Sequence, residues 1–357
     1  MTIEFIGYIA TRESSEIIPA QGPVIDIDHV EKVARAHEAS GFDRALVAFH
    51  STSPESILVA GHAAAATSRL GLMIAHRPGF TQPTLAARQF ATLDRFTRGR
   101  VAVHIITGGD DAEQRQDGDF LTKDERYART DEYLDVVKRT WTSETPFDHE
   151  GRFYRFERAF STVKPVQKPH IPIYFGGASD AAIPVAGRHA DIYALWGETH
   201  DQVRELTARV RAAAAVHGRR PRFSLSLRPI LADTEERAWK RADEFLERAT
   251  ALIHQTGFAR SREPVNSGSL RLLEAAARGP RLDRRLWTGM AALTGARGNS
   301  TALVGTPEQV AEALIDYYDL GVTTFLIRGF EPHADAVDYG RTLIPLTRAL
   351  AARRAAA

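Results

Sequence analysis

Hydrophobic and polar positions alternate in blocks along most of the chain. Short apolar runs, such as residues 3–9 and 44–49, predict β-strands, and segments with helical spacing, such as residues 83–96, follow them. The run over residues 101–106 is interrupted only by His104, and such runs are typical of strands buried on both faces of a parallel sheet. The pattern therefore predicts an α/β fold with a parallel sheet.

The number of strand–helix repeats narrows the fold class. We expect strands over residues 3–9, 44–49, 70–75, 101–106, 171–175, 191–195, 223–230 and 323–327. We expect helices over residues 26–39, 54–68, 83–96, 124–142, 202–216, 234–253, 307–320 and 334–351, and one that begins at Ser179 or Asp180. Eight strands, each followed by a helix, predict a (β/α)8 TIM barrel formed by a single domain over residues 1–357. A doubly wound open sheet is the alternative, but no G-x-G-x-x-G motif follows the first strand.

Three segments interrupt this rhythm. Residues 108–122 predict a polar loop, and residues 147–156 predict a small hairpin that turns at Glu150 and Gly151. Residues 253–300 are weakly periodic and rich in Gly, Ser and Arg. Because long loops within compact domains are usually lids or mobile segments, we expect a lid insertion at residues 253–300 that a ligand orders.

The composition excludes several classes of protein. Hydrophobic residues make up 43% of the chain and charged residues 25%, which is ordinary for a soluble globular protein. The net charge of +1 gives no case for binding to nucleic acid or membrane. The absence of cysteine excludes disulfides, thiolate metal sites and a cysteine nucleophile, and the 13 scattered histidines form no metal-binding motif. The N-terminal stretch lacks the pattern of a signal peptide, which indicates a cytoplasmic protein.

In a TIM barrel the chemistry lies on the loops that follow the strands. The turn at Gly176–Gly177 either holds a phosphate with the help of the Ser179 hydroxyl, or is an ordinary turn in which Ser179 or Asp180 caps the next helix. His104 is either a hydrogen-bonded core histidine or a contact for a flat ligand such as a flavin ring. Trp196, at the end of the sixth strand, either fills the core or forms the wall of a substrate pocket.

Six stretches occur in a fixed order along the chain: RPGFTQPTLAARQFATLDRFTRGR (77–100), HIITGGDDAEQRQDG (104–118), DERY (124–127), YFGGASD (174–180), YALWGE (193–198) and TALVG (301–305). Together they resemble the bacterial luciferase-like flavin monooxygenases, and most closely the alkanesulfonate monooxygenase group. The resemblance implies a (β/α)8 barrel that assembles as a homodimer or homotetramer. It also implies a two-component system, in which a separate NAD(P)H-dependent FMN reductase supplies reduced FMN (FMNH2). In that family O2 adds at the flavin C4a carbon, and the peroxyflavin oxygenates a small organosulfur substrate, such as an alkanesulfonate or a sulfone.

The resemblance also assigns the cofactor-binding residues. It places Gly177, Ala178 and Ser179 at the FMN phosphate, together with Arg126 and Tyr127. It places Phe49, His50, His104, Thr107 and Glu113 around the isoalloxazine ring. The alkanesulfonate enzymes usually carry Asn where His104 stands, and both side chains can donate a hydrogen bond to the ring.

On the substrate side the sequence departs from that group. The group's Arg-x-His pair in the seventh strand corresponds to Ser226 and Arg228, and its Tyr after the eighth strand corresponds to Phe330. The catalytic candidates that remain are Trp196, Arg228, Arg297 and His333. Arg228 either recognises charge, together with Arg12, or stabilises the peroxyflavin anion, or instead pairs with a carboxylate such as Glu198.

Two other functions remain open at this point. One is a deazaflavin-dependent oxidoreductase of the same superfamily, which transfers hydride and needs no O2. The other is a non-catalytic flavin-binding paralogue, which the altered substrate residues motivate. For the leading function, the expected partners are the reductase, O2 and a small-molecule substrate.

Overall fold

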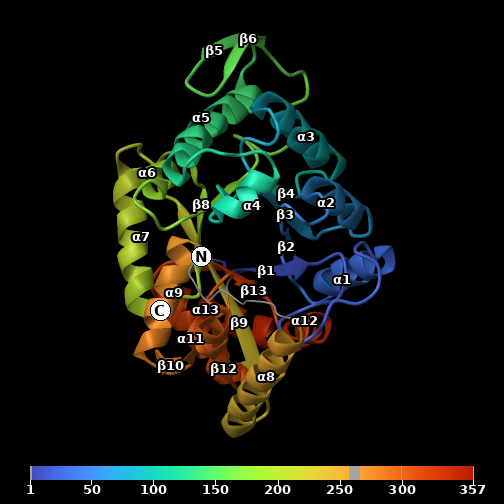
Figure 1. Cartoon of the computed structure of the whole chain (residues 1–357), viewed down its shortest axis with the longest axis vertical. Coiled ribbons are helices and arrows are strands. Elements are labelled where there is room, and N and C mark those ends of the chain that lie inside the picture. Colours follow the sequence, from blue (N-terminus) through green and yellow to red (C-terminus); the bar gives the residue numbers. More distant parts are fainter. Residues whose placement is uncertain (1, 257–265, 299, 357) are drawn as a thin grey trace. The chain divides into compact units, whose positions relative to one another are not determined.

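The computed structural model describes residues 2–256, 266–298 and 300–356. Its barrel strands are β1 (Glu4–Ile9), β2 (Arg44–Val47), β3 (Gly71–His76), β4 (Val101–Ile105), β7 (Ile173–Gly176), β8 (Ile192–Trp196), β9 (Arg222–Leu231) and β13 (Val322–Ile327). Their order in the sheet is β9–β13–β1–β2–β3–β4–β7–β8, and β8 pairs again with β9, so the sheet closes on itself. The expected (β/α)8 TIM barrel is confirmed, and Figure 1 labels its elements.

The internal contacts of the chain define two compact units. The first unit comprises Met1–Ala45, Ala194–Ala208 and Arg222–Ala357, and the second comprises Leu46–Tyr193 and Arg209–Pro221. The division matters for function because all of the expected cofactor residues belong to the second unit, whereas all of the expected catalytic residues belong to the first.

The second unit carries clear local signals for its helices. They are α2 (Ser56–Ala65), α3 (Pro83–Phe96), α4 (Asp111–Gln116), α5 (Lys123–Thr142) and α6 (Ala182–His189), with a hairpin of β5 (Phe147–Glu150) and β6 (Arg155–Ala159) after α5 (Figure 1). Pro83 occupies the first turn of α3, where its missing N–H is harmless. Thr122 and Glu125 form a capping box at the start of α5. These signals are why the expected bounds of both helices agree with the structure to within one residue.

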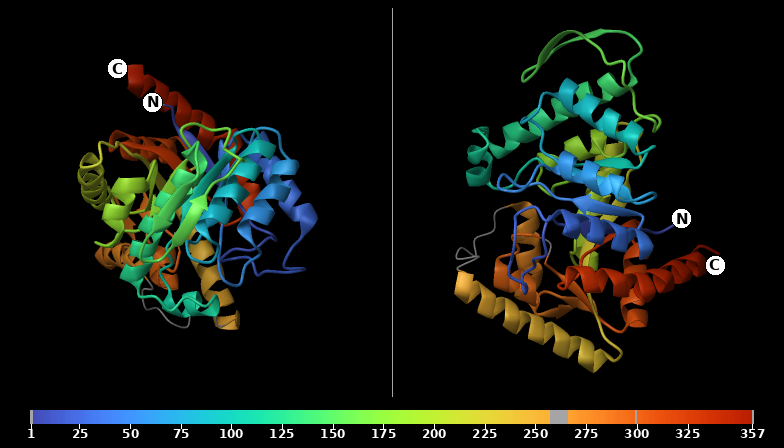
Figure 2. Two further views of the ribbon diagram at one scale, coloured as in Figure 1. Left: turned by 90° about the horizontal axis from the view of Figure 1, so that it is seen from above. Right: turned by 90° about the vertical axis from the view of Figure 1, so that its right-hand side faces the viewer.

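The first unit contains most of the remaining helices. They are α1 (Ile27–Ala39), α8 (Glu235–Thr256), α9 (Ser267–Arg278), α10 (Gly289–Thr294), α11 (Pro307–Asp319), α12 (Pro332–Arg341) and α13 (Leu343–Ala356), whereas α7 (His200–Ala215) spans both units. Asp26 accepts a hydrogen bond from the backbone of His29 and so begins α1, as the sequence predicts. The helix α8 is the long gold helix of Figure 2.

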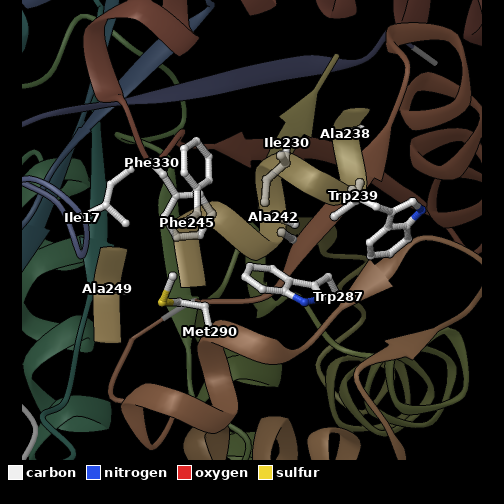
Figure 3. Packing of buried hydrophobic residues seen from close by; sticks show 12 residues of the cluster. Ile17, Ile230, Ala238, Trp239, Ala242, Phe245, Ala249, Trp287, Met290 and Phe330 are labelled. Atoms are coloured by element: carbon white, nitrogen blue, oxygen red, sulfur yellow. The ribbon is translucent and has the colours of Figure 1, made fainter. Parts of the chain in front are cut away.

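Residues 253–300 contain more structure than their weak periodicity predicts. Besides α9 and α10, they form a short hairpin of β10 (Arg281–Leu282) and β11 (Leu286–Trp287). Trp287 and Met290 are buried in a cluster with Phe245 of α8 and with Phe330, which Figure 3 shows. Residues 257–265 lie outside the described part of the chain, so the expectation of a lid remains a prediction.

Three other elements differ from expectation. The polar loop contains the short helix α4, whose N-cap Asp110 accepts hydrogen bonds from the backbone N–H groups of Ala112 and Glu113. The TALVG stretch forms a further strand, β12 (Ala302–Gly305), which pairs in parallel with the second half of β9. The single terminal helix that we expected is two helices, α12 and α13, which meet at Thr342.

Among the described residues, no helix is both long and apolar enough to cross a membrane. Nor do three or more His, Asp or Glu side chains in this part of the chain gather into a group that could hold a metal ion.

Candidate active site

The turn after β7 is shaped by glycine. Gly177 has φ +138°, a conformation that residues with a side chain rarely adopt. A Cβ atom at Gly177 would lie 2.6 Å from the hydroxyl of Tyr127 and 3.0 Å from Cβ of Ala182, so the turn is closely covered by these two side chains. The Tyr193 hydroxyl donates a hydrogen bond of 2.5 Å to the Gly177 carbonyl oxygen, which fixes the turn from another side.

Ser179 does not cap the helix that follows this turn. The helix α6 begins at Ala182 with Ala181 as its N-cap, and no side chain caps it. Oγ of Ser179 is shielded from solvent and makes no well-formed hydrogen bond to the described residues, although it lies near enough to the Tyr127 hydroxyl to lower the pKa of Tyr127. Asp180 is exposed and forms an ion pair of 2.7 Å with Arg209. Buried hydroxyls without a partner are uncommon in proteins, so the Ser179 hydroxyl is available to a ligand.

The two neighbouring residues of α5 have different surroundings. Burial raises the pKa of Tyr127, whose hydroxyl lies over Gly177. Arg126 is almost fully buried, and its guanidinium donates to the carbonyl oxygen of Leu121 (2.6 Å) and to Oδ1 of Asp111 (2.7 Å). Arg126 therefore ties α4 to α5, and only Tyr127 of the expected pair is turned toward the glycine turn.

His104 lies on β4, where it is opposite Tyr174 of the neighbouring strand β7. Burial lowers the pKa of His104 to about 4, so the imidazole is neutral near pH 7. Its Nδ1 atom is buried without a hydrogen-bond partner in the described residues. A neutral imidazole carries one donor and one acceptor, and here one of the two is not used by the protein.

Thr107 follows β4 and is buried. Its hydroxyl is 3.3 Å from that of Thr130, which in turn donates to the carbonyl oxygen of Arg126. The next residue, Gly108, has φ +92°, and a Cβ atom there would lie 2.3 Å from Nε2 of Gln114. The backbone at the end of β4 thus passes directly beneath the side chain of Gln114, in a conformation that glycine permits.

Glu113 is held by several donors at once. Nη2 of Arg77 lies 2.9 Å from its carboxylate, the backbone N–H of Ser51 lies 3.0 Å away, and Nδ1 of His50 lies 3.6 Å away. Burial opposes the ionisation of Glu113, but hydrogen bonds from His50, Ser51 and Arg77 outweigh it and lower the pKa to about 2. The loops after β2, β3 and β4 are joined at this carboxylate.

A cavity of about 580 Å³ lies beside this network. Phe49, Arg77, Phe80, Gln89 and Arg129 are among its lining residues, and Phe49 is the only expected cofactor residue that lines it. The guanidinium of Arg77 lies 5.0 Å from the ring of Phe49 and 5.6 Å from that of Phe80. Arg77 lies at a strand end and begins the longest of the six stretches, but it is not among the expected cofactor residues.

In the first unit, Arg228 is bound by protein groups on every nitrogen. Its Nη1 atom forms an ion pair of 2.6 Å with Glu16, and Nη2 and Nε donate to the carbonyl oxygens of Gly329 (3.0 Å) and Arg328 (3.3 Å). The guanidinium also lies 3.7 Å from the ring centre of Phe330. The pairing with Glu198 that we considered is wrong, because the carboxylate partner is Glu16.

Glu198 has a different partner. Its carboxylate lies 2.8 Å from Nη2 of Arg271 on α9, and Tyr317 donates to its backbone carbonyl oxygen. Burial raises the pKa of Glu198, although Arg271 opposes that shift. A buried ion pair thus anchors α9 to the end of β8.

The other three catalytic candidates are dispersed within the first unit. Trp196 is partly buried and packs against α9, where a Cβ atom at Gly268 would lie 2.9 Å from its ring. Arg297 is exposed after α10. His333 is half-buried in the first turn of α12.

The expected cofactor residues fit a flavin mononucleotide on two observations. The buried Ser179 hydroxyl without a partner, beside a glycine turn, fits a phosphate. The unpartnered Nδ1 of His104 fits the hydrogen-bonding edge of a flat ring. The Nη atoms of Arg126 contact Leu121 and Asp111, and only its buried Nε lacks a partner among the described residues.

Comparisons with known proteins agree with the fold. A family model described as luciferase-like monooxygenase matches residues 3–324. A riboflavin lyase (RcaE), solved with modified FMN and riboflavin, has a TM-score of 0.79 and 20% identity over 98% of this chain and 92% of that chain. DmoA from Hyphomicrobium sulfonivorans has a TM-score of 0.78 and 22% identity, over 98% and 89% of the two chains. An F420-dependent secondary alcohol dehydrogenase has a TM-score of 0.70 and 16% identity, over 97% and 99%.

Proposed function

We propose a specific reaction for this chain, which belongs to the luciferase-like monooxygenase family and is a flavin-dependent oxidoreductase. The chain would act as the oxygenase of a two-component system that uses FMNH2 and O2. One oxygen atom would enter a small organosulfur substrate, such as an alkanesulfonate or a sulfone, and the other would leave as water.

The buried hydroxyl of Ser179 is the observation that carries this proposal. It neither caps α6 nor makes a well-formed hydrogen bond to another described residue, and it adjoins a turn that only glycine fits well. A phosphate bound there would accept hydrogen bonds from Ser179 and Tyr127 and from the backbone N–H groups of the turn. A flavin nucleotide meets this requirement through its 5′-phosphate.

The remaining cofactor residues have distinct roles in the proposal. His104, neutral near pH 7, would offer its free ring nitrogen to the flavin ring, with Thr107 nearby on the same strand end. Glu113 would fix the loops around the ring through Arg77, Ser51 and His50. Bound reduced flavin supplies the electrons that activate O2, and the protein supplies binding, orientation and exclusion of water.

The sequence supports an external source of reduced flavin. It has no G-x-G-x-x-G motif after the first strand, so nothing in it indicates a nicotinamide dinucleotide site. A separate NAD(P)H-dependent FMN reductase would therefore supply FMNH2.

An anaerobic titration with photoreduced FMN tests the proposal. We expect FMNH2 to bind more tightly than FMN, and Ser179→Ala to weaken FMNH2 binding by about 1–2 kcal/mol, the scale of one hydrogen bond to a charged group. Ser143→Ala is the matched control, because that exposed hydroxyl donates only to Thr145 in the same unit. An unchanged affinity in Ser179→Ala, or a loss equal to that of the control, contradicts the phosphate assignment.

A second candidate is a deazaflavin-dependent oxidoreductase that transfers hydride. The structural likeness to an F420-dependent alcohol dehydrogenase favours keeping it. Oxygen consumption after mixing with FMNH2 separates the two functions, because a hydride-transfer enzyme needs no O2. Product analysis over a substrate panel would also expose a non-catalytic flavin-binding paralogue.

A further inference from the structure

Two arginines act on the charge of one carboxylate in the first unit, but only one of them is paired with it. Arg228 directly follows the part of β9 that pairs with β13, and Arg328 directly follows β13. Glu16 forms the ion pair of 2.6 Å with Arg228, and the charge of Arg328 also acts on it. Burial opposes ionisation of Glu16, yet the two arginines lower its pKa to about 2. Glu16 is therefore ionised near pH 7, and the three side chains together carry one surplus positive charge.

The surplus charge resides on Arg328. All three nitrogens of Arg228 are engaged by Glu16 and by two carbonyl oxygens, and its guanidinium rests on the ring of Phe330. The guanidinium of Arg328 instead lies 4.5 Å from the ring of Tyr8, and it has no hydrogen bond or ion pair among the described residues. Its Nε atom is shielded from solvent.

The position of Arg328 is firmly set by its neighbours. Its carbonyl oxygen accepts from Nε of Arg228, and the carbonyl oxygen of Gly329 accepts from Nη2. Phe330 is buried, and Figure 3 shows its ring beside the Phe245 ring and the aliphatic side chain of Ile17. The ring centres of Phe330 and Phe245 are 5.3 Å apart. The backbone that carries Arg328 is thus fixed on the buried pair of Arg228 and Glu16.

A partly buried guanidinium without a partner is costly, and an anion offsets that cost. The planar fork of arginine matches two oxygens of a carboxylate or a sulfonate. A single surplus charge is balanced by a monoanion.

We propose that Arg328 recognises a single oxyanionic group, a carboxylate or a sulfonate, on the substrate. Arg228 is a positioning residue, because Glu16 neutralises it and its donors hold the backbone of Arg328 and Gly329. The proposal rests on the proposed function, and it moves charge recognition from Arg228, the candidate that the sequence suggested, to Arg328.

Binding to the full-length protein without flavin tests the proposal by calorimetry. The probes are propane-1-sulfonate and butyrate, with ethyl methyl sulfone as a neutral probe of similar size, in a buffer without chloride. We expect both anions to bind and the neutral sulfone to bind at least tenfold more weakly. Arg328→Gln should weaken anion binding by about 10- to 100-fold, the scale of charged hydrogen bonds, and leave sulfone binding unchanged. Arg222→Gln, at the start of β9, is the matched control, since it removes a charge from the pair of Arg222 with Glu4 of β1.

Two results would overturn the assignment. One is equal binding of the anions and the sulfone to the wild-type protein, a comparison that needs no variant to fold. The other is equal loss of anion affinity in Arg328→Gln and in Arg222→Gln. FMNH2 titration of the same samples keeps the two proposals apart, because a failure of the proposed function appears as lost flavin binding and a failure of the Arg328 assignment does not.

Discussion

Both units contain a buried arginine bound to a carboxylate at the ends of barrel strands, but the two pairs are balanced differently. In the second unit, Arg77 and Glu113 form a neutral pair, and the carboxylate also accepts from Ser51. In the first unit, the positive charges of two arginines, Arg228 and Arg328, both act on Glu16. Both carboxylates have a pKa of about 2. The same pairing therefore fixes loops in one unit and leaves a cation for a ligand in the other.

The units also differ in how they respond to acid. The second unit buries three histidines, His76, His104 and His189, and the first unit buries His37, each with its pKa lowered to about 4, mainly by burial. A histidine whose folded-state pKa lies below its unfolded value stabilises the fold fully above about pH 6.5. That contribution is lost as the pH falls from about 6.5 to about 4.

We therefore expect the largest effect from acidification, on the second unit. Each of the three histidines there would contribute on the order of 3 kcal/mol less to the free energy of unfolding at the low end of this range, whereas the first unit has one such histidine. Hydrogen exchange at pH 7 and pH 5, corrected for intrinsic rates, should show greater loss of protection in the second unit. His104→Asn, which removes one of the titrating groups, should reduce the difference. Equal loss in both units would contradict this expectation. Below about pH 4.5, Glu16 and Glu113 add a further loss to both units.

The next largest effect is expected from Arg228→Met. Breaking a buried ion pair leaves an uncompensated charge and typically costs about 3–5 kcal/mol, and the partial exposure of Glu16 favours the lower end. Denaturant unfolding measures this loss. Arg222→Met on the same strand is the control, and its exposed pair with Glu4 should contribute no more than about 1 kcal/mol. If Arg228→Met keeps its stability but loses turnover, Arg228 has the catalytic role that the sequence suggested.

The sequence predicted the fold well where local signals are strong. Pro83 and the pair of Thr122 and Glu125 mark helix starts by chemistry that acts over a few residues, so α3 and α5 could be predicted closely. The helix α4 has only six residues, which is too short for a periodic pattern. The strand β12 depends on its pairing with β9, which local sequence does not encode.

In the candidate site, too, local features could be predicted and contacts between distant residues could not. The glycine turn and Ser179 are local features, and the structure places the Tyr127 hydroxyl beside the turn. The partner of Arg228 could not be predicted, because Glu16 is distant from Arg228 in the sequence. Any other carboxylate near a strand end could have paired with Arg228 equally well. The contacts of Arg126 could not be predicted either, because a guanidinium is attracted equally to a phosphate and to a carboxylate such as that of Asp111.

The smallest effect is expected from Arg77→Met, and it sharpens the comparison of the two pairs. Glu113 would keep the N–H and the hydroxyl of Ser51, together with His50, so the lost arginine leaves a carboxylate that is still solvated by donors. We expect a loss of about 1–2 kcal/mol, the scale of one hydrogen bond to a charged group, and thus less than in Arg228→Met. The pKa of Glu113 should rise from about 2 toward its ordinary value, because Arg77 is one of the groups that lower it. Carboxyl-carbon NMR of selectively labelled protein measures that pKa, and denaturant unfolding measures the stability. A loss of stability as large as that of Arg228→Met would mean that Arg77 alone stabilises the Glu113 carboxylate, and that Ser51 and His50 do not compensate for its removal.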